Sequence, residues 1–199
     1  KVNLEELARC LETPEQSLEE KYGRYKEKVL SQGLGWKPSE GQLVAYADEG
    51  PFPAQLAAFY LMFEQEFPNI LQQLGVNSLR DYFFGRYSDT LKRIGRKTRP
   101  GVNQLLEKLV KHEIALVTNS PREGDWNGLD ISRCHLVPFA QKHIVDPNSD
   151  YVEINGRRIY TNRPHYRQII ESEKPDIVIG DTLSMDLAVP HTMDIPVAL

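Results

Sequence analysis

Residues 174–186, KPDIVIGDTLSMD, constrain the fold of this chain more than any other stretch. The apolar run 177–179 predicts a buried strand, and Gly180 predicts a tight turn directly after it. In open α/β sheets, such a turn delivers side chains to the edge where ligands bind, which places the carboxylate of Asp181 there. Asp186 brings a second carboxylate five residues later. Two such groups suit Mg²⁺, which takes oxygen ligands and keeps several waters.

A second segment, residues 99–124, places more polar groups at the end of a strand. It begins with a helix that has apolar residues at helical spacing, and the run 114–117, IALV, then predicts a buried parallel strand. Thr118, Asn119 and Ser120 follow, and hydroxyl, amide and backbone N–H groups at such a strand end can hold a phosphate. Each segment alone also fits a strand and an ordinary turn with solvated polar residues. The two together favour a site, because both put polar groups at one edge of a sheet.

Together these segments resemble the haloacid dehalogenase (HAD)-like hydrolase superfamily, a group of Mg²⁺-dependent phosphohydrolases and their relatives. The second motif of that family is an apolar strand ending in Thr or Ser, after a helix that begins P-G-V. Thr118 and residues 100–102 match it. The fourth motif is a strand ending in G-D-x-x-x-x-D, which Gly180, Asp181 and Asp186 match. The resemblance covers about the second half of the chain, residues 99–199.

The family's third motif is a Lys, often followed by Pro, shortly before the fourth motif. Arg163, which precedes Pro164, is the best match, and Lys142 is the alternative further upstream. A guanidinium is not equivalent to a compact ammonium group, but it still balances the charge of carboxylates and phosphate. Asn-Gly at 155–156 predicts a type I′ hairpin over residues 151–160 that positions Arg163. We expect Arg163 to lie in an open, wet cleft.

The family's first motif is D-x-D-x-T at the end of the central strand, and no D-x-D occurs in the first hundred residues. The only apolar run with acids at its end there is LVAYADE, residues 43–49. If Gly50 takes the glycine position of the motif, Ala47 falls at the nucleophile and Glu49 at the acid/base. A shift of one residue makes Asp48 the nucleophile but leaves Gly50 at the acid/base position.

A helix is the better local interpretation of the same stretch. Residues 39–42, SEGQ, form a capping-box pattern and Gly50 is a good helix stop, so we expect a helix over residues 39–49. The strand with the first motif then lies before Lys1. The chain begins with Lys and not with Met, which is consistent with a segment ahead of it.

The first half of the chain is helical in pattern, unlike the second half. The expected helices span residues 2–11, 18–30, 52–74 and 78–94. Pro68 is expected to end or kink the third of them. We predict a mainly helical cap or insert over residues 1–98, with the first core strand near 42–49 or missing before residue 1, and an α/β core over residues 99–199. The resemblance implies that this core is a Rossmann-like (HAD-type) parallel sheet, over which the helical cap domain closes to select the substrate.

Composition and charge exclude several classes of protein. The 199 residues carry a net charge of −4 without a long basic stripe, so nucleic acid is not an expected partner. The two cysteines, Cys10 and Cys134, are far apart and suit a reducing, cytoplasmic setting. No membrane span or signal peptide is visible in the sequence, and the histidines lack zinc spacing.

The resemblance implies a Mg²⁺-dependent phosphatase that hydrolyses a small phosphate monoester, a phosphorylated metabolite, through an aspartyl-phosphate intermediate. Mg²⁺ is the implied cofactor, because it offsets the repulsion between an anionic nucleophile and phosphate. The implied site residues are Asp181 and Asp186 for the metal, Thr118, Asn119, Ser120 and Arg163 for phosphate, and Thr118, Arg163, Asp181 and Asp48 for catalysis.

Two other functions are compatible with the same motifs. One is that of a catalytically degenerate HAD-fold binding protein, whose signature would be Ala47 at the nucleophile position. The other is haloacid dehalogenase-type hydrolysis of a carbon–halogen bond, which uses the same Asp nucleophile but does not need the metal. The retained acidic pair, Asp181 and Asp186, counts against the second of these.

Overall fold

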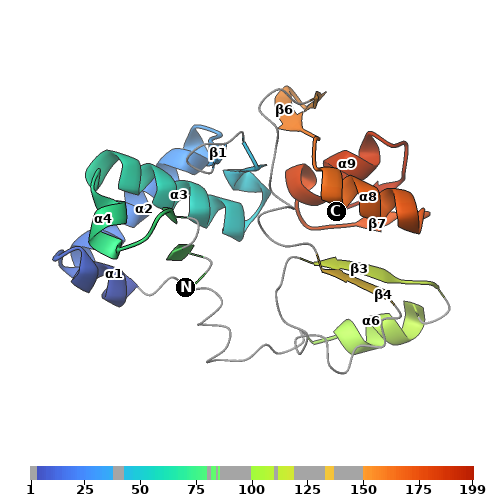
Figure 1. The fold of residues 1–199 in the computed structure, drawn as a ribbon, viewed down its shortest axis with the longest axis horizontal. Coiled ribbons are helices and arrows are strands. Elements are labelled where there is room, and N and C mark those ends of the chain that lie inside the picture. The colour runs from blue at the N-terminus through green and yellow to red at the C-terminus, as the bar shows by residue number, and fades with distance from the viewer. Residues whose placement is uncertain are drawn as a thin grey trace.

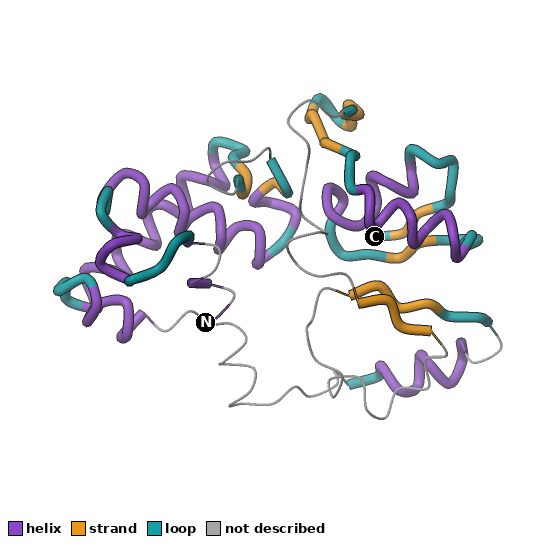
Figure 2. The backbone as a smooth tube through the Cα atoms, viewed as in Figure 1, coloured by secondary structure: helices purple, strands orange, loops and turns teal. Residues whose placement is uncertain are grey.

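The computed structural model describes residues 4–37, 43–79, 82–83, 85, 100–109, 112–118, 133–136 and 150–199. Figures 1 and 2 show an N-terminal lobe of helices, which we define as the described residues up to 85, and a C-terminal lobe with most of the strands. The helices are α1 (Leu4–Cys10), α2 (Glu15–Ser31), the 3₁₀ helix η1 (Ala47–Glu49), α3 (Pro51–Glu66), α4 (Ile70–Leu74), α6 (Val102–Leu109), α8 (Pro164–Glu173), the π-helical turn η2 (Leu183–Leu187) and α9 (Ala188–His191). The strands are β1 (Gly35–Trp36), β2 (Ala45–Tyr46), β3 (Ala115–Thr118), β4 (Arg133–Leu136), β5 (Tyr151–Ile154), β6 (Arg157–Tyr160), β7 (Val178–Ile179) and β8 (Val197–Ala198).

The central helix of the N-terminal lobe is α3. It packs against α2 and β1, and most of its apolar side chains are buried. Phe59 and Phe63 stack with ring centroids 5.9 Å apart, and the ring of Phe83 lies 5.1 Å from that of Phe59. Buried rings of this size account for much of the apolar surface that folding removes from water. Pro68 lies in the break between α3 and α4, so the prediction that it ends the helix is confirmed.

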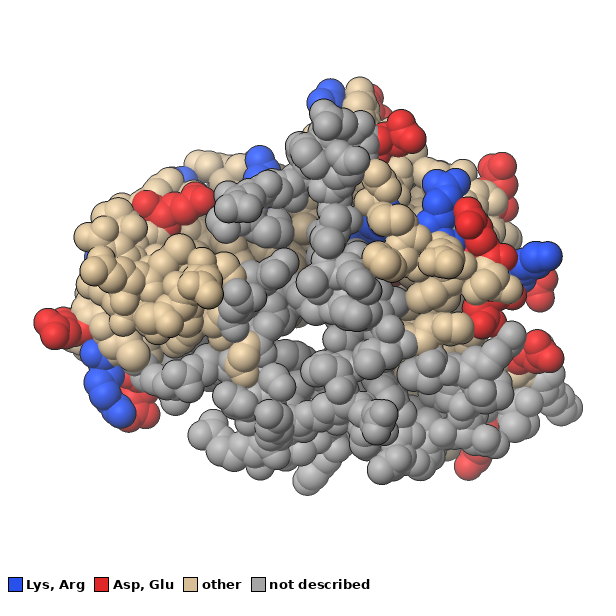
Figure 3. All heavy atoms as spheres, viewed as in Figure 1, with Lys and Arg blue, Asp and Glu red and all other residues tan. Residues whose placement is uncertain are grey.

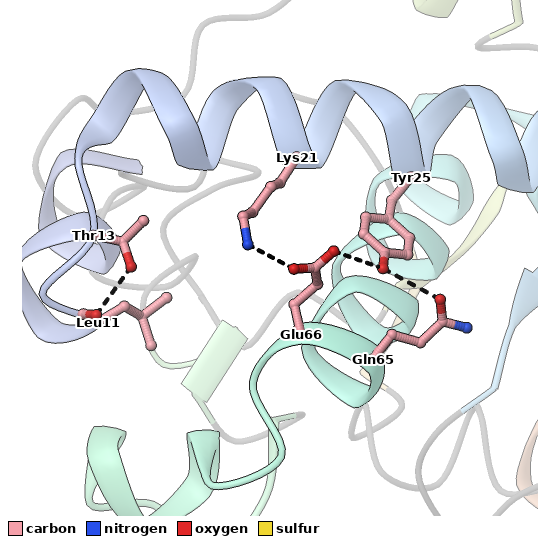
Figure 4. A network of polar contacts seen from close by, with 6 residues as sticks. All are labelled: Leu11, Thr13, Lys21, Tyr25, Gln65 and Glu66. Carbon is pink, nitrogen blue, oxygen red and sulfur yellow. Dashed lines mark hydrogen bonds and ion pairs between the residues drawn. The ribbon is translucent and has the colours of Figure 1, made fainter.

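Polar contacts join α2 to the end of α3 (Figure 4). Lys21 Nζ lies 2.6 Å from Glu66 Oε2, and the Tyr25 hydroxyl lies 3.2 Å from both Glu66 Oε1 and Gln65 Oε1. The hydrogen bond from Lys21 lowers the pKa of Glu66, and the hydrogen bond from Tyr25 acts in the same direction. Glu66 is therefore an ionised acceptor for two donors on α2.

The C-terminal lobe contains both parallel strand pairs of the described residues, β3 with β4 and β7 with β8. Tyr166 and Ile170 of α8 pack with Val189 of α9, and Val117 of β3 packs against this cluster. The strands of the described residues form four separate two-stranded sheets. A continuous, Rossmann-like parallel sheet therefore stays a prediction.

The hairpin of β5 and β6 confirms the prediction made from Asn-Gly. Ile154 pairs with Arg157 across the turn. Asn155 and Gly156 have φ values of 53° and 73°, which are the positive angles that a type I′ turn requires. The local sequence alone was sufficient to predict this element.

The predicted helix over residues 39–49 is wrong. Its second half forms β2, which runs antiparallel to β1, and then η1; residues 38–42 lie outside the described parts of the chain. The N–H of Val44 donates to the carbonyl of Trp36 at 2.9 Å, and both residues are buried. Tertiary pairing and burial thus outweigh the local helix-capping pattern.

The prediction that residues 177–179 are buried is also wrong. A strand forms there, but Ile177 is 50% exposed and Ile179 is 72% exposed, while Val178 between them is half-buried. This alternation indicates that only one face of β7 is covered. An apolar run in the sequence does not reveal which of its two faces the fold will cover.

None of the helices in the described parts of the chain is long and apolar enough to cross a membrane.

On the face seen in Figure 3, acidic and basic side chains are interspersed over the outer side of the C-terminal lobe. Among the described residues of this outer side, charges of the two signs partly offset one another.

Candidate active site

Arg163 is the buried centre of the candidate site. It leads from the hairpin into α8, and only 1% of the residue is exposed. Its Nη2 donates a hydrogen bond to the backbone carbonyl of Val44, at 3.0 Å. Burial lowers the pKa of Arg163 to about 10, while the negative charges of Asp186 and Glu49 oppose that shift. The guanidinium therefore stays positively charged at neutral pH, next to two carboxylates.

The expectation of an open, wet cleft around Arg163 is wrong. The side chain extends out of the C-terminal lobe to the Val44 carbonyl in the N-terminal lobe, so the meeting of the two lobes removes it from water. The other part of the expectation, that Arg163 balances carboxylate charge, agrees with the structure at one of the two acids. Arg163 interacts electrostatically with Asp186, the second acid of G-D-x-x-x-x-D.

Asp186 is fixed by contacts to its side chain and to its backbone. Its Oδ2 accepts a hydrogen bond from the Thr182 N–H at 3.2 Å, and its own N–H donates to the Thr182 carbonyl at 2.9 Å. The Tyr166 hydroxyl donates to the Asp186 carbonyl at 2.8 Å. A Cβ added to Gly180 would lie only 2.4 Å from the Asp186 Cβ. Glycine is therefore needed at 180, because Asp186 folds back against that backbone.

Asp181 follows Gly180 at the end of β7 and is exposed. Asp181 and Asp186 are both oxygen donors, the ligand type that Mg²⁺ prefers. Within the described ranges no three side chains of His, Cys, Asp or Glu converge as a metal-binding group. A Mg²⁺ ion at this turn would therefore bind through one or two carboxylates and retain its waters, which is its usual behaviour in proteins.

Glu49 connects η1 of the N-terminal lobe to η2 of the C-terminal lobe. Its Oε2 accepts a hydrogen bond from the Ser184 N–H at 2.9 Å, and its Oε1 accepts one from Ser184 Oγ at 2.5 Å. Only 2% of Ser184 is exposed. The carboxylate at one candidate acid/base position therefore holds the loop between Asp181 and Asp186, instead of facing open solvent.

Asp48 points to the hairpin. Its two carboxylate oxygens accept hydrogen bonds from Nη1 and Nη2 of Arg157, at 2.8 and 2.6 Å. These bonds lower the pKa of Asp48, so it is ionised at neutral pH. The Arg157 guanidinium also lies over the Tyr46 ring, 4.6 Å from its centroid. A nucleophilic role for Asp48 would require the carboxylate to leave this paired geometry.

The remaining predicted phosphate ligands are only partly described. Thr118 ends β3 opposite Leu136 of β4, and the structure describes its backbone but not its side chain. Asn119, Ser120 and Lys142 lie outside the described residues. The packing of Val117 against the cluster that contains Tyr166 nevertheless brings the end of β3 beside α8, the helix that starts after Arg163.

Three residues of this arrangement were not predicted from the sequence in their observed roles. They are Tyr166, Ser184 and Glu49, and the last was expected only at the acid/base position and not as a partner of the loop between Asp181 and Asp186. Tyr166 carried a weak signal, because it lies three positions after Arg163 and residues at that spacing share one face of a helix. Ser184 lies between the two acids of the fourth motif and carried no signal of its own.

Comparisons of this chain with protein-family models, with curated proteins and with solved structures give no match. The candidate site is therefore argued from its own chemistry: two carboxylates on one loop, a buried guanidinium that interacts with one of them, Asp186, and a glycine that allows the loop to close tightly.

Proposed function

We propose that this chain forms part of a Mg²⁺-dependent phosphatase of the HAD type, acting on a small phosphorylated metabolite. The observation that supports the proposal most is the buried guanidinium of Arg163 beside Asp186 and Glu49. A cation in that position balances carboxylates that would otherwise repel one another and a phosphate.

Each residue has a distinct task in this proposal. Asp181 and Asp186 hold Mg²⁺, which when bound neutralises charge on the phosphate oxygens. Thr118 and the backbone after it bind the phosphate. Asp48 is the candidate nucleophile: its oxygen would bond to phosphorus while the bond from phosphorus to the ester oxygen breaks, and the ester oxygen would leave as an alcohol with a proton from water. A second water would then cleave the aspartyl phosphate to give inorganic phosphate and the free carboxylate. The reducing cytoplasm is the setting we propose, because the two cysteines lie far apart in the sequence.

Calorimetry with Mg²⁺ tests the metal site. We expect the parent chain to bind Mg²⁺ and Asp181→Asn to bind it far more weakly, because one anionic ligand is lost. Asp176→Asn, an exposed acid before β7, is the matched control and should bind Mg²⁺ like the parent. Equal Mg²⁺ affinity in the parent and Asp181→Asn would remove Asp181 from the metal site.

A second candidate function is that of a non-catalytic binding protein with the same fold. It is favoured by the bidentate ion pair that occupies Asp48 and by Ala47, which is 1% exposed at the other candidate nucleophile position. A screen of phosphate monoesters separates the two functions. Metal-dependent turnover that Asp48→Asn abolishes supports the phosphatase, whereas binding of vanadate without any turnover supports the binding protein.

A further inference from the structure

Tyr166 reaches Asp186 from a different element of the lobe. It lies on α8, is 4% exposed, and its hydroxyl donates to the Asp186 backbone carbonyl at 2.8 Å. Its ring packs with Ile170 and Val189. The core of the C-terminal lobe therefore fixes the position of the ring. The hydrogen bond from its hydroxyl in turn holds the backbone of Asp186 in place.

Ser184 of the Asp186 loop is held by Glu49 of the N-terminal lobe, and the hydrogen bonds between Asp186 and Thr182 are short in sequence. Thr182 bonds both the side chain and the N–H of Asp186, but it belongs to the same turn and moves with it. A tie to a rigid helix is required to fix the turn relative to the rest of the lobe. Tyr166 in the first turn of α8 supplies such a tie, and Arg163 directly before the helix supplies a cation to the same region.

We propose that Tyr166 is a positioning residue for Asp186 as a metal ligand, an inference that rests on the proposed function. By donating to the carbonyl of Asp186, the hydroxyl fixes the backbone from which the carboxylate projects. Groups that support a metal ligand in this way are typically worth about 10–100-fold in metal affinity.

Four variants test the inference by Mg²⁺ calorimetry. Tyr166→Phe removes the hydroxyl and leaves the ring in its cluster, and we expect about a 10-fold or greater loss of Mg²⁺ affinity. Tyr25→Phe is the matched control, since it deletes a buried, hydrogen-bonded tyrosine hydroxyl on α2 in the other lobe. Ile170→Val loosens the packing around Tyr166 without touching the hydroxyl. Asp186→Asn reports on the metal site itself. Tyr25→Phe, the control for loss of a hydroxyl, and Ile170→Val, the control for packing, should both bind Mg²⁺ like the parent.

The outcomes separate this inference from the proposed function. If the parent binds no Mg²⁺, or if Asp186→Asn binds it unchanged, the metal site fails and the inference fails with it. If Asp186→Asn loses affinity but Tyr166→Phe does not, the proposed function stands and the role of Tyr166 is refuted. An equal loss of Mg²⁺ affinity in Ile170→Val would indicate a general packing effect and would also overturn the inference.

Discussion

Arg163 Nη2 donates to the carbonyl oxygen of Val44 at 3.0 Å, across a sequence separation of 119 residues. The bond links the start of α8 in the C-terminal lobe to the residue before β2 in the N-terminal lobe. Because the same guanidinium interacts with Asp186 and Glu49, it connects the lobe interface to the loop that carries Asp181 and Asp186. A change at Arg163 should therefore alter both stability and ligand binding.

Arg163→Ala should lower the free energy of unfolding by about 3 kcal/mol, because it leaves two partly buried carboxylates and a carbonyl without their cation. Arg163→Lys should lose less, since an ammonium keeps the charge but not the planar donor geometry. Arg167→Ala is the control on the same helix. Its exposed ion pair with Glu171 is expected to contribute about 0.5 kcal/mol. Urea unfolding measures all three, and equal losses for the two alanine variants would contradict the role of Arg163.

Ser184→Ala should lower the free energy of unfolding by about 1–2 kcal/mol, because Glu49 loses the hydroxyl donor to its half-buried carboxylate. The matched control is Ser172→Ala, whose hydroxyl bonds the Ile169 carbonyl on the exposed surface of α8. That variant should stay within about 0.5 kcal/mol of the parent. A Ser184 variant as stable as the Ser172 variant would show that the hydroxyl bond between Ser184 and Glu49 contributes nothing to folding, since the backbone bond remains in the variant.

Gly180→Ala should lower the free energy of unfolding by about 1–3 kcal/mol. The added Cβ would meet the Asp186 Cβ at 2.4 Å and the Leu187 Cδ2 at 3.1 Å, so the loop would have to move. Gly23→Ala, in the interior of α2 with nothing within 4 Å of the added atom, should instead stabilise by about 0.5–1 kcal/mol. Thermal melts of both variants measure these opposite changes in stability. A stabilised Gly180→Ala would exclude the close approach of Asp186.

The ion pair of Glu66 predicts a dependence of stability on pH. Its hydrogen bond from Lys21 lowers its folded-state pKa, so the bond stabilises the protein above the ordinary Glu range, about pH 4.3. That stabilisation is lost as the pH falls through the lower, folded-state pKa. The advantage of the parent over Glu66→Gln should be at most about 1 kcal/mol at pH 7 and should shrink as the pH falls below the ordinary Glu range, about pH 4.3.

Unfolding curves of the parent, Glu66→Gln and the exposed control Glu64→Gln at several pH values measure this effect. At pH 7 the control should stay within about 0.5 kcal/mol of the parent, as is usual for an exposed side chain. An advantage of the parent over Glu66→Gln that grows on acidification would have the wrong sign for a depressed carboxyl pKa.

Elements with a local signal were predictable from the sequence. The Asn-Gly pair requires positive φ and produced the hairpin, and Pro68 interrupted the helical pattern after residue 52. The capping box at 39–42 also carried a local signal, yet the stretch after it folded as β2, because pairing with β1 supplied hydrogen bonds that the local pattern could not anticipate.

The sequence by itself determined which chemical groups exist and where each of them lies along an element: Gly180 and two acids around a strand end, and an arginine at the start of a helix. Only the tertiary structure decided that Arg163 is buried, that Tyr166 supports Asp186, and that Glu49 meets Ser184 across 135 positions. The physical reason is the distance along the sequence over which each effect acts. Turn geometry and helix periodicity act over a few residues, whereas burial and long-range hydrogen bonds depend on which surfaces the packed lobes cover.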